Sequence, residues 1–255
     1  MSFTVPAEAY DRYMGRYARL LAPLLANFAG IGPGRQVLDV GCGPGALTGE
    51  LARRVGADRV AAAEPAPAFA AACRALVPGV DVREAPAEAL PWADASFDAV
   101  LSQLVISFLA DADAGVGEMR RVLEPGGVLA ACTWDYADQM QMLRTFWDAA
   151  RALDAEAADE ARVLAYGNPG DLRRLWGRAD LRDVETSPLH VAVAYTGFDD
   201  YWDGFETGTG PAGAYCISLD ADRRAALREE CRRRLGNPTG AFTLTARAWA
   251  VRGTA

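Results

Sequence analysis

The chain has 255 residues, of which 51% are hydrophobic and 24% charged, so it can bury one large core or two modest ones. Its net charge is −8, and all 26 of its basic residues are arginines. This balance argues against a nucleic-acid partner, which needs a basic face to neutralise phosphates, and the lack of lysine excludes Schiff-base chemistry on that side chain.

An N-terminal helical lead-in, residues 1–30, precedes the first expected strand. Within it, residues 7–29 read as one or two helices broken near Pro23, because proline interrupts helical hydrogen bonding. Over residues 36–134, short apolar runs then alternate with helical stretches, which is the pattern of βαβ units around a parallel sheet. The expected strands are 36–40, 59–63, 80–83, 97–102 and 127–134, and the expected helices are 46–55, 66–76 and 112–123.

The alternation of short apolar runs and helical stretches ends after residue 134. Segments 184–195 and 242–251 are strand-like and could pair as an antiparallel edge hairpin. Residues 196–237 lie between them as an insertion, rich in aromatics and glycines at its start, and predict a helical and aromatic cap. We therefore expect one α/β domain over residues 1–255, with a doubly wound, mostly parallel seven-stranded sheet. Further helices are expected at 140–154, 155–164 and 171–178.

A glycine-rich loop follows the first expected strand, in the run VLDVGCGPG that ends at Gly45. Glycines here allow a tight turn and the close approach of a ligand to the backbone. A dinucleotide site has its third glycine one residue later, so the spacing disfavours a pyrophosphate. After the second strand, Glu64 could accept both hydroxyls of a ribose. A purely structural turn and a solvated glutamate are the alternative interpretations.

Three more motifs follow in order: AEALPW, SFDAV and RVLEPGG. Together with the glycine loop and Glu64, they resemble the motif series of the class I S-adenosylmethionine-dependent methyltransferases. The series is most similar to the ubiquinone/menaquinone C-methyltransferase group, and the resemblance covers residues 36–134. It implies a Rossmann-like fold and S-adenosyl-L-methionine as the cofactor.

The resemblance also implies contacts for the methionyl part of that cofactor. Gly41, Cys42 and Gly43 would offer backbone contacts, and Asp39 would order the loop or meet the ammonium group, unless it only fixes turn amides. The run YDRYMGRY resembles a lead-in of the same group. Arg16 within it would clasp the cofactor carboxylate in two-point fashion, with an ordinary amphipathic helix as the alternative.

For the adenosine and the sulfonium, the resemblance implies a second set of contacts. Relatives usually carry an aspartate at the position of Pro86 and often a histidine at that of Ser107, so this chain departs from the usual adenine contact and lacks a base common in the family. Ser102 and Gln103 would lie near the sulfonium, at the end of the fourth strand. The remaining expected contacts are Glu64 with the ribose, and Pro65, Pro86, Ala87 and Glu88 around the adenine.

The insertion would cover the acceptor. Aromatic side chains there would exclude water and bind an apolar or planar molecule, although a second hydrophobic core or a homodimer contact is the alternative. Asp135 and Tyr136, after the fifth strand, are further pocket candidates. The expected substrate-binding residues are Tyr10, Tyr13, Trp134, Tyr201, Trp202, Phe205 and Tyr215.

No catalytic residue is identified, and the sole histidine, His190, is only a weak candidate because it falls within an expected strand. The five cysteines are scattered without a Cys-x-x-Cys pair, so no metal is predicted. No run reaches the roughly 18 apolar residues of a membrane span, and residues 1–6 lack a signal-peptide pattern, so we expect no membrane partner and a cytoplasmic location.

The predicted function is methyl transfer to an O, N or C nucleophile of a small molecule, driven by proximity and in-line orientation. Three alternatives remain. One is a protein that binds the cofactor without methyl transfer, as a scaffold or a repurposed cyclase-type catalyst. Another is a nicotinamide-dependent oxidoreductase, with which the loop spacing disagrees. The third is methylation of a protein or RNA.

Overall fold

The fold is described from a computed structural model, which describes residues 7–255. The expectation that no signal peptide is present concerned residues 1–6, which lie outside the described part of the chain. No helix within residues 7–255 is long and apolar enough to cross a membrane.

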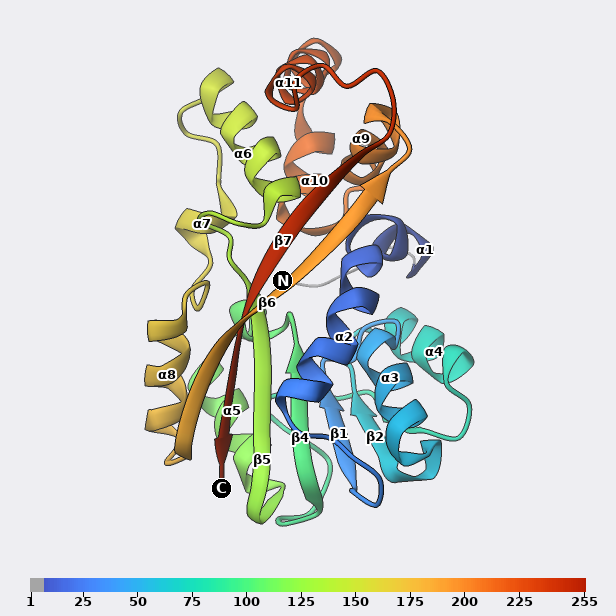
Figure 1. Cartoon of the computed structure of the whole chain (residues 1–255), viewed down its shortest axis with the longest axis vertical. Helices are drawn as coiled ribbons and strands as arrows, with labels where there is room; N and C mark the ends of the chain where they lie inside the picture. The colour runs from blue at the N-terminus through green and yellow to red at the C-terminus, as the bar shows by residue number, and fades with distance from the viewer. Residues whose placement is uncertain (1–6) are drawn as a thin grey trace.

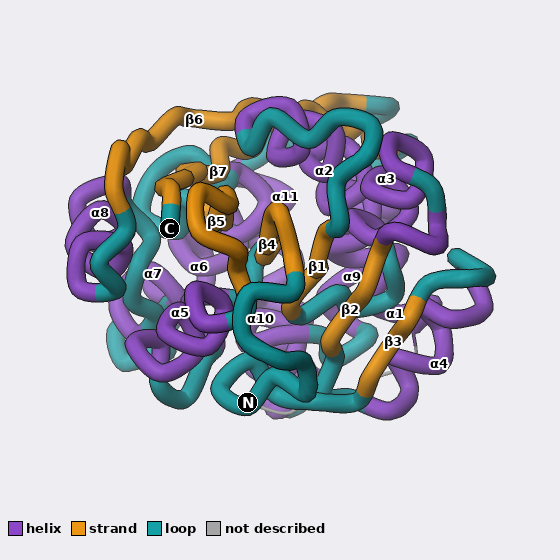
Figure 2. The backbone as a smooth tube through the Cα atoms, turned by 90° about the horizontal axis from the view of Figure 1, so that it is seen from below, coloured by secondary structure: helices purple, strands orange, loops and turns teal. Residues whose placement is uncertain are grey.

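One seven-stranded sheet organises the protein, with the strand order β3-β2-β1-β4-β5-β7-β6 (Figure 2). The first five strands pair in parallel, whereas β7 is antiparallel to both of its neighbours. This confirms the predicted Rossmann-like sheet with an antiparallel hairpin at its edge. The strands are β1 (Val37–Val40), β2 (Val60–Ala63), β3 (Asp81–Arg83), β4 (Phe97–Gln103), β5 (Leu123–Trp134), β6 (Arg182–Tyr195) and β7 (Phe242–Thr254).

Helices cover both faces of the sheet, as the apolar composition of its central strands requires. Every residue of β1 and β2 is buried. Helices α2 and α3 pack on one face, and α5 and α8 on the other (Figure 2). The helices are α1 (Ala7–Tyr10), α2 (Arg16–Phe28), α3 (Ala46–Val55), α4 (Pro67–Leu76), α5 (Ala112–Arg121), α6 (Gln141–Leu153), α7 (Glu160–Val163), α8 (Pro169–Arg178), α9 (Phe198–Glu206), α10 (Gly210–Ser218) and α11 (Ala221–Arg234), with short helical turns η1 (Asp11–Gly15), η2 (Ala57–Arg59) and η3 (Ile106–Phe108).

The N-terminal helix changes its geometry at a different place from the one predicted. Residues Asp11–Gly15 form a π-helical turn, while Pro23 lies inside the continuous helix α2. A proline removes one intrahelical hydrogen bond, but α2 buries an apolar stripe that includes Leu21 and Leu25, and this packing outweighs the loss.

The helix expected over residues 155–164 is also much shorter in the structure. Only Glu160–Val163 is helical, because side chains around it compete for backbone amides. Asp154 accepts a hydrogen bond from the Glu156 amide at 3.0 Å and helps end α6, and Asp159 accepts from the Ala161 amide and begins α7.

The hairpin β6–β7 extends well beyond the other strands and carries a second layer of helices, α6, α9, α10 and α11 (Figure 1). Three aromatic residues of the insertion, Tyr201, Trp202 and Phe205, are at most 1% exposed there. The ring of Phe205 stacks on Phe146 of α6 with 4.4 Å between centroids. These insertion aromatics therefore build a hydrophobic core, which is the alternative interpretation of the sequence.

Candidate functional site

A cavity of about 260 Å³ lies at the carboxyl ends of the parallel strands. In the sheet, β2 and β3 lie on one side of β1, whereas β4 and β5 lie on its other side. Open α/β sheets bind ligands where the strand order reverses in this way. Segments that follow four strands line the cavity, together with Tyr10 of α1 and Phe69 of α4. The lining residues are Tyr10, Gly41, Gly43, Glu64, Pro65, Phe69, Pro86, Ala87, Glu88, Gln103, Leu104, Val105, Phe108, Leu109 and Ala110.

The glycine loop forms one wall through backbone shapes that other residues adopt poorly. The φ angles of Gly41, Gly43 and Gly45 are +73°, +53° and +105°. At Gly41 a Cβ atom would also lie 2.4 Å from a methyl group of Val105. The amides of Gly41 and its successor both donate to the carbonyl of Ala63, which fixes the loop against β2. The loop can therefore present its backbone to a ligand at close range.

Glu64 connects two loops at the floor of this cavity. Its Oε2 accepts a hydrogen bond from the Gly43 amide and its Oε1 from the Ala66 amide, both at 2.9 Å. Burial raises the pKa of Glu64, and the two backbone hydrogen bonds oppose that rise. Each carboxylate oxygen can accept a second hydrogen bond, so the group can also receive the hydroxyls of a ribose.

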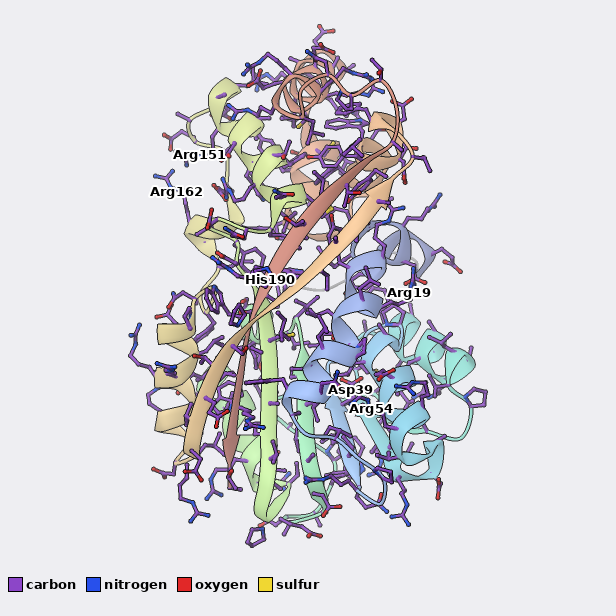
Figure 3. All side chains as sticks on the ribbon, viewed as in Figure 1. Arg19, Asp39, Arg54, Arg151, Arg162 and His190 are labelled. Carbon is purple, nitrogen blue, oxygen red and sulfur yellow. The ribbon has the colours of Figure 1, made fainter. Side chains whose placement is uncertain are left out.

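Three of the predicted cofactor residues lie behind the lining. Asp39 is fully buried and accepts a hydrogen bond from Thr48 Oγ1 at 2.6 Å, below α2 and α3 (Figure 3). Burial raises the pKa of Asp39 to about 7, although the Thr48 hydrogen bond lowers it. Ser102 donates to the Val40 carbonyl at 2.9 Å, and Cys42 is buried. Asp39 is thus bonded to α3 and Ser102 to the end of β1, and the expected role of Asp39 at the glycine loop stays a prediction.

The residues predicted to surround the adenine lie together in this cavity, with one additional aromatic residue. Pro65, Pro86 and Ala87 line the cavity together with Phe69, which the sequence reading missed. Glu88 also lines it, and its Oε1 accepts hydrogen bonds from the amides that follow Leu109, at 3.1 and 3.4 Å. The wall is thus mostly apolar, which suits a flat heterocycle.

Gln103 carries an unused hydrogen-bond acceptor at the opposite wall. Its Nε2 donates to the Ala18 carbonyl at 3.1 Å, whereas its buried Oε1 has no hydrogen-bond partner within residues 7–255. Leaving a buried acceptor unpaired costs about 1–3 kcal/mol, so a donor supplied by a ligand would be favourable here.

Arg16 does not line the cavity. Its guanidinium lies 3.1 Å from an Asp200 carboxylate oxygen and 4.7 Å above the ring of Tyr195. The structure therefore gives no support to the predicted contact between Arg16 and the cofactor carboxylate, because the side chain joins α2 to the cap instead.

A second, smaller cavity of about 50 Å³ adjoins the first and shares Tyr10, Leu104 and Phe108 with it. It contains three predicted substrate residues, Tyr10, Tyr13 and Trp134, and also the candidate Tyr136. The insertion contributes its residues 209–211. The full lining is Tyr10, Tyr13, Met14, Leu104, Phe108, Trp134, Tyr136, Leu143, Glu160, Thr209, Gly210 and Pro211.

The other predicted substrate residues lie elsewhere. Phe205 supports this cavity from behind, with its ring centroid 5.4 Å from that of Tyr13, and Tyr201 and Trp202 belong to the same core. Tyr215 lines a separate groove between α6, α10 and α11. Asp135 forms an ion pair with Arg247.

The weak catalytic candidate His190 is exposed on β6 and lines neither cavity (Figure 3). Its backbone neighbour on β7 is Arg247. An edge-strand position of this kind fits the structural reading of a lone histidine, and it does not place the imidazole near either cavity.

Two parts of the cavity linings were not predicted from the sequence. One is the segment that follows β4, and the other is Glu160. The segment could have been found, because loops that follow parallel strands line ligand sites. Glu160 had no such signal, since it stands in the run DAEAADEAR among other acids that are mostly exposed. Only the packing of α7 brings it to the second cavity.

Comparison with known proteins agrees with this geometry. A family profile described as a methyltransferase domain matches residues 38–131. An uncharacterised protein of Mycobacterium bovis is 34% identical over 220 residues, covering 83% of this chain and 75% of that protein. The demethylmenaquinone methyltransferase of Mycolicibacterium paratuberculosis is 37% identical over 51% of each chain.

The malonyl-(acyl-carrier protein) O-methyltransferase of Erwinia billingiae is 32% identical over 57% of each chain. Among solved structures, a proposed type II methyltransferase from Anaeromyxobacter dehalogenans is 25% identical with a TM-score of 0.64, covering 92% of this chain and 95% of that one. The chain belongs to the class I S-adenosylmethionine-dependent methyltransferases. It spans about half the length of several curated relatives, 42% for an uncharacterised Mycobacterium tuberculosis protein.

Proposed function

We propose that the protein transfers a methyl group from S-adenosylmethionine to a small-molecule acceptor. One observation carries the proposal: the larger cavity at the strand ends opens beside a smaller aromatic cavity, and Tyr10, Leu104 and Phe108 line both. A donor in one cavity and an acceptor in the other would meet across this shared wall.

The residues of the larger cavity fit the cofactor of the family. Gly41 and Gly43 let the backbone approach a ligand, and Glu64 offers a carboxylate to ribose hydroxyls. Gln103 holds a buried acceptor that has no partner among residues 7–255. When bound, S-adenosylmethionine supplies a methyl group already activated by a sulfonium. The departure at Pro86 leaves the adenine amine to backbone groups near Ala87.

The task left to this chain is orientation. Holding two reactants in a near-attack arrangement can supply about 7–11 kcal/mol of the barrier. The aromatic lining of the smaller cavity would exclude water from the reaction. Its volume of about 50 Å³ suits the reacting end of a small molecule, and the acidic charge of −8 disfavours a nucleic-acid acceptor.

Titration calorimetry with S-adenosylmethionine and with NADH tests the proposal first. We expect heat from the former alone, followed by release of S-adenosylhomocysteine when a panel of small acceptors is added. Absence of binding by S-adenosylmethionine would sink the proposal. Binding without turnover across the panel would favour a cofactor-binding protein that does not transfer methyl. The structural neighbour SpnF, a cyclase, shares the fold at 16% identity with a TM-score of 0.55.

A further inference from the structure

Among residues 7–255, Glu160 is the one carboxylate that lines the smaller cavity. It is 3% exposed and begins the single-turn helix α7. Trp147 of α6 donates its indole N–H to Glu160 Oε2 at 2.7 Å. Next to it, Asp159 caps the same turn and is held by two hydrogen bonds from Arg144, at 2.8 and 3.0 Å. The carboxylate of Glu160 is therefore fixed in position by α6 and α7 together.

This carboxylate faces the cavity without a basic partner. The lining residues, all within the described part of the chain, include no arginine, and the sequence has no lysine. The neighbouring guanidinium of Arg144 is bonded to Asp159, Asp148 and the Tyr136 carbonyl instead. A buried charge is unfavourable unless it is paired, so a cation brought by a ligand would complete the arrangement.

The rest of the lining would also attract a cation. Tyr10, Tyr13, Phe108, Trp134 and Tyr136 contribute aromatic rings, whose faces carry negative electrostatic potential. The hydroxyl of Tyr13 is buried and has no hydrogen-bond partner within residues 7–255. It can accept an N–H bond. Rings, carboxylate and hydroxyl together complement an ammonium group better than a neutral alcohol.

We propose that the acceptor is a primary or secondary amine that binds as its ammonium ion against Glu160, and that Glu160 takes the proton that frees the nitrogen for methylation. This inference rests on the proposed function. It follows from the position of the carboxylate, because the cavity of about 50 Å³ has room for the amine end of a ligand and shares its wall with the cofactor cavity.

The reaction balances with the groups named. The ammonium nitrogen gives one proton to a Glu160 oxygen and regains its lone pair. That lone pair forms the bond to the methyl carbon, while the carbon–sulfur bond breaks and its electron pair stays on sulfur. The product is a methylated ammonium and a neutral thioether, and Glu160 returns its proton to solvent when the product leaves.

The electrostatic surroundings of Glu160 are consistent with this role. The pKa of Glu160 is raised to about 7 by the balance of four influences: burial and, less strongly, Asp159 raise it, while the Trp147 hydrogen bond and Arg144 lower it. Tyr13 and Tyr136 face the carboxylate from η1 and from the loop after β5, and burial raises the pKa of both phenols, so they stay neutral. A base with a pKa near neutrality is well matched to proton transfer.

The test uses n-butylamine and n-butanol as isosteric probes. The full-length protein is saturated with S-adenosylhomocysteine, and binding of each probe is followed by saturation-transfer NMR at pH 8. We expect the ammonium probe to bind at least ten times more tightly than the alcohol. Its affinity should fall when the pH is lowered from 8 to 5, because Glu160 becomes protonated while the amine stays charged. Equal affinity of the two probes, or no binding of butylammonium, would overturn the inference.

Two variants complete the experiment. Glu160→Gln should lose the preference for the ammonium probe and its dependence on pH, whereas Glu156→Gln, an exposed carboxylate of the same loop, should retain both. Calorimetry with S-adenosylhomocysteine should give the same affinity for all three proteins. If the wild type does not bind S-adenosylhomocysteine, the result counts against the proposed function. If it binds S-adenosylhomocysteine but shows no preference for the ammonium probe, the result counts against the inference alone. The comparison of probes on the wild type holds even if a variant fails to fold.

Discussion

The two adjoining cavities are built in different ways. The larger one is formed by the segments that follow β1, β2, β3 and β4, and the backbone of the glycine loop makes one of its walls. The smaller one is formed by side chains from the N-terminal helix, the segment after β4, the end of β5, α6, α7 and the insertion. A ligand held by backbone needs a particular chain geometry, whereas a ligand held by side chains needs a particular packing.

This difference explains how each region can vary. The geometry of the glycine loop restricts residue type at a few adjacent positions, so the loop leaves a motif in the sequence. The smaller cavity depends on residues far apart in the chain that meet only through the sheet and the cap. Its lining residues can change one at a time without altering the geometry of the glycine loop.

The largest effect is expected for the buried carboxylate behind the glycine loop. The pKa of Asp39 is raised from 3.8 to about 7, so between these pH values the unfolded chain loses a proton that the folded chain keeps. The stability of the wild type should therefore fall as pH rises from 4 to 7. Asp39→Asn should remove up to about 4 kcal/mol of that fall. Urea unfolding at several pH values measures it.

The exposed Asp203→Asn is the control for this experiment. It should show the same dependence on pH as the wild type. If the free energy of unfolding depended on pH in the same way for Asp39→Asn and the wild type, Asp39 would be ionised in the folded protein at pH 5, against the expectation.

A smaller effect, on both stability and cofactor affinity, is expected at Gly41. Gly41→Ala places a Cβ at a φ of +73° and 2.4 Å from Val105, which should lower both stability and cofactor affinity by about 2–3 kcal/mol. In Gly32→Ala the new methyl meets open space, so that variant should behave as wild type. Calorimetric titration with S-adenosylmethionine and thermal melts report the two effects. If both variants bound equally well, the backbone of the loop would not be what holds the ligand.

Glu64→Gln should weaken S-adenosylmethionine binding by about 1.5–2 kcal/mol, or roughly 10- to 30-fold, because a neutral amide accepts ribose hydroxyls less strongly. The matched control is Glu84→Gln, which removes only an exposed ion pair with Arg74. Competition with adenosine and with its analogue lacking the 2′ and 3′ hydroxyls refines the assignment. The wild type should bind adenosine more tightly than the analogue, whereas Glu64→Gln should bind the two with similar affinity.

The smallest effect on binding is expected at Arg16. Arg16→Ala should change the affinity for S-adenosylmethionine less than about 3-fold, because the guanidinium is engaged by Asp200 and Tyr195 outside the cavity. Its loss should instead lower the free energy of unfolding by about 1 kcal/mol. An affinity drop above 10-fold would show that the side chain turns to the cofactor on binding, as the sequence resemblance implies.

Much of the fold follows from local patterns. Mostly apolar runs such as β1 and β2 predict buried parallel strands, and the alternation of strand and helix over residues 36–134 predicts their order. The patterns failed where side chains redirect the backbone. Asp154 and Asp159 shorten the helix expected over 155–164, and the apolar stripe of α2 overrides Pro23.

Local residue patterns predict the sheet, the glycine loop and the acid at position 64, because glycine geometry and the alternation of strands and helices leave a motif in the chain. Packing in three dimensions settles which aromatics line a cavity and which fill a core. It separated Tyr13 and Trp134 from Tyr201, Trp202 and Phe205, placed Arg16 against the cap, and brought Glu160 beside the cofactor cavity. Burial and proximity arise from packing between distant segments, and composition alone does not specify them.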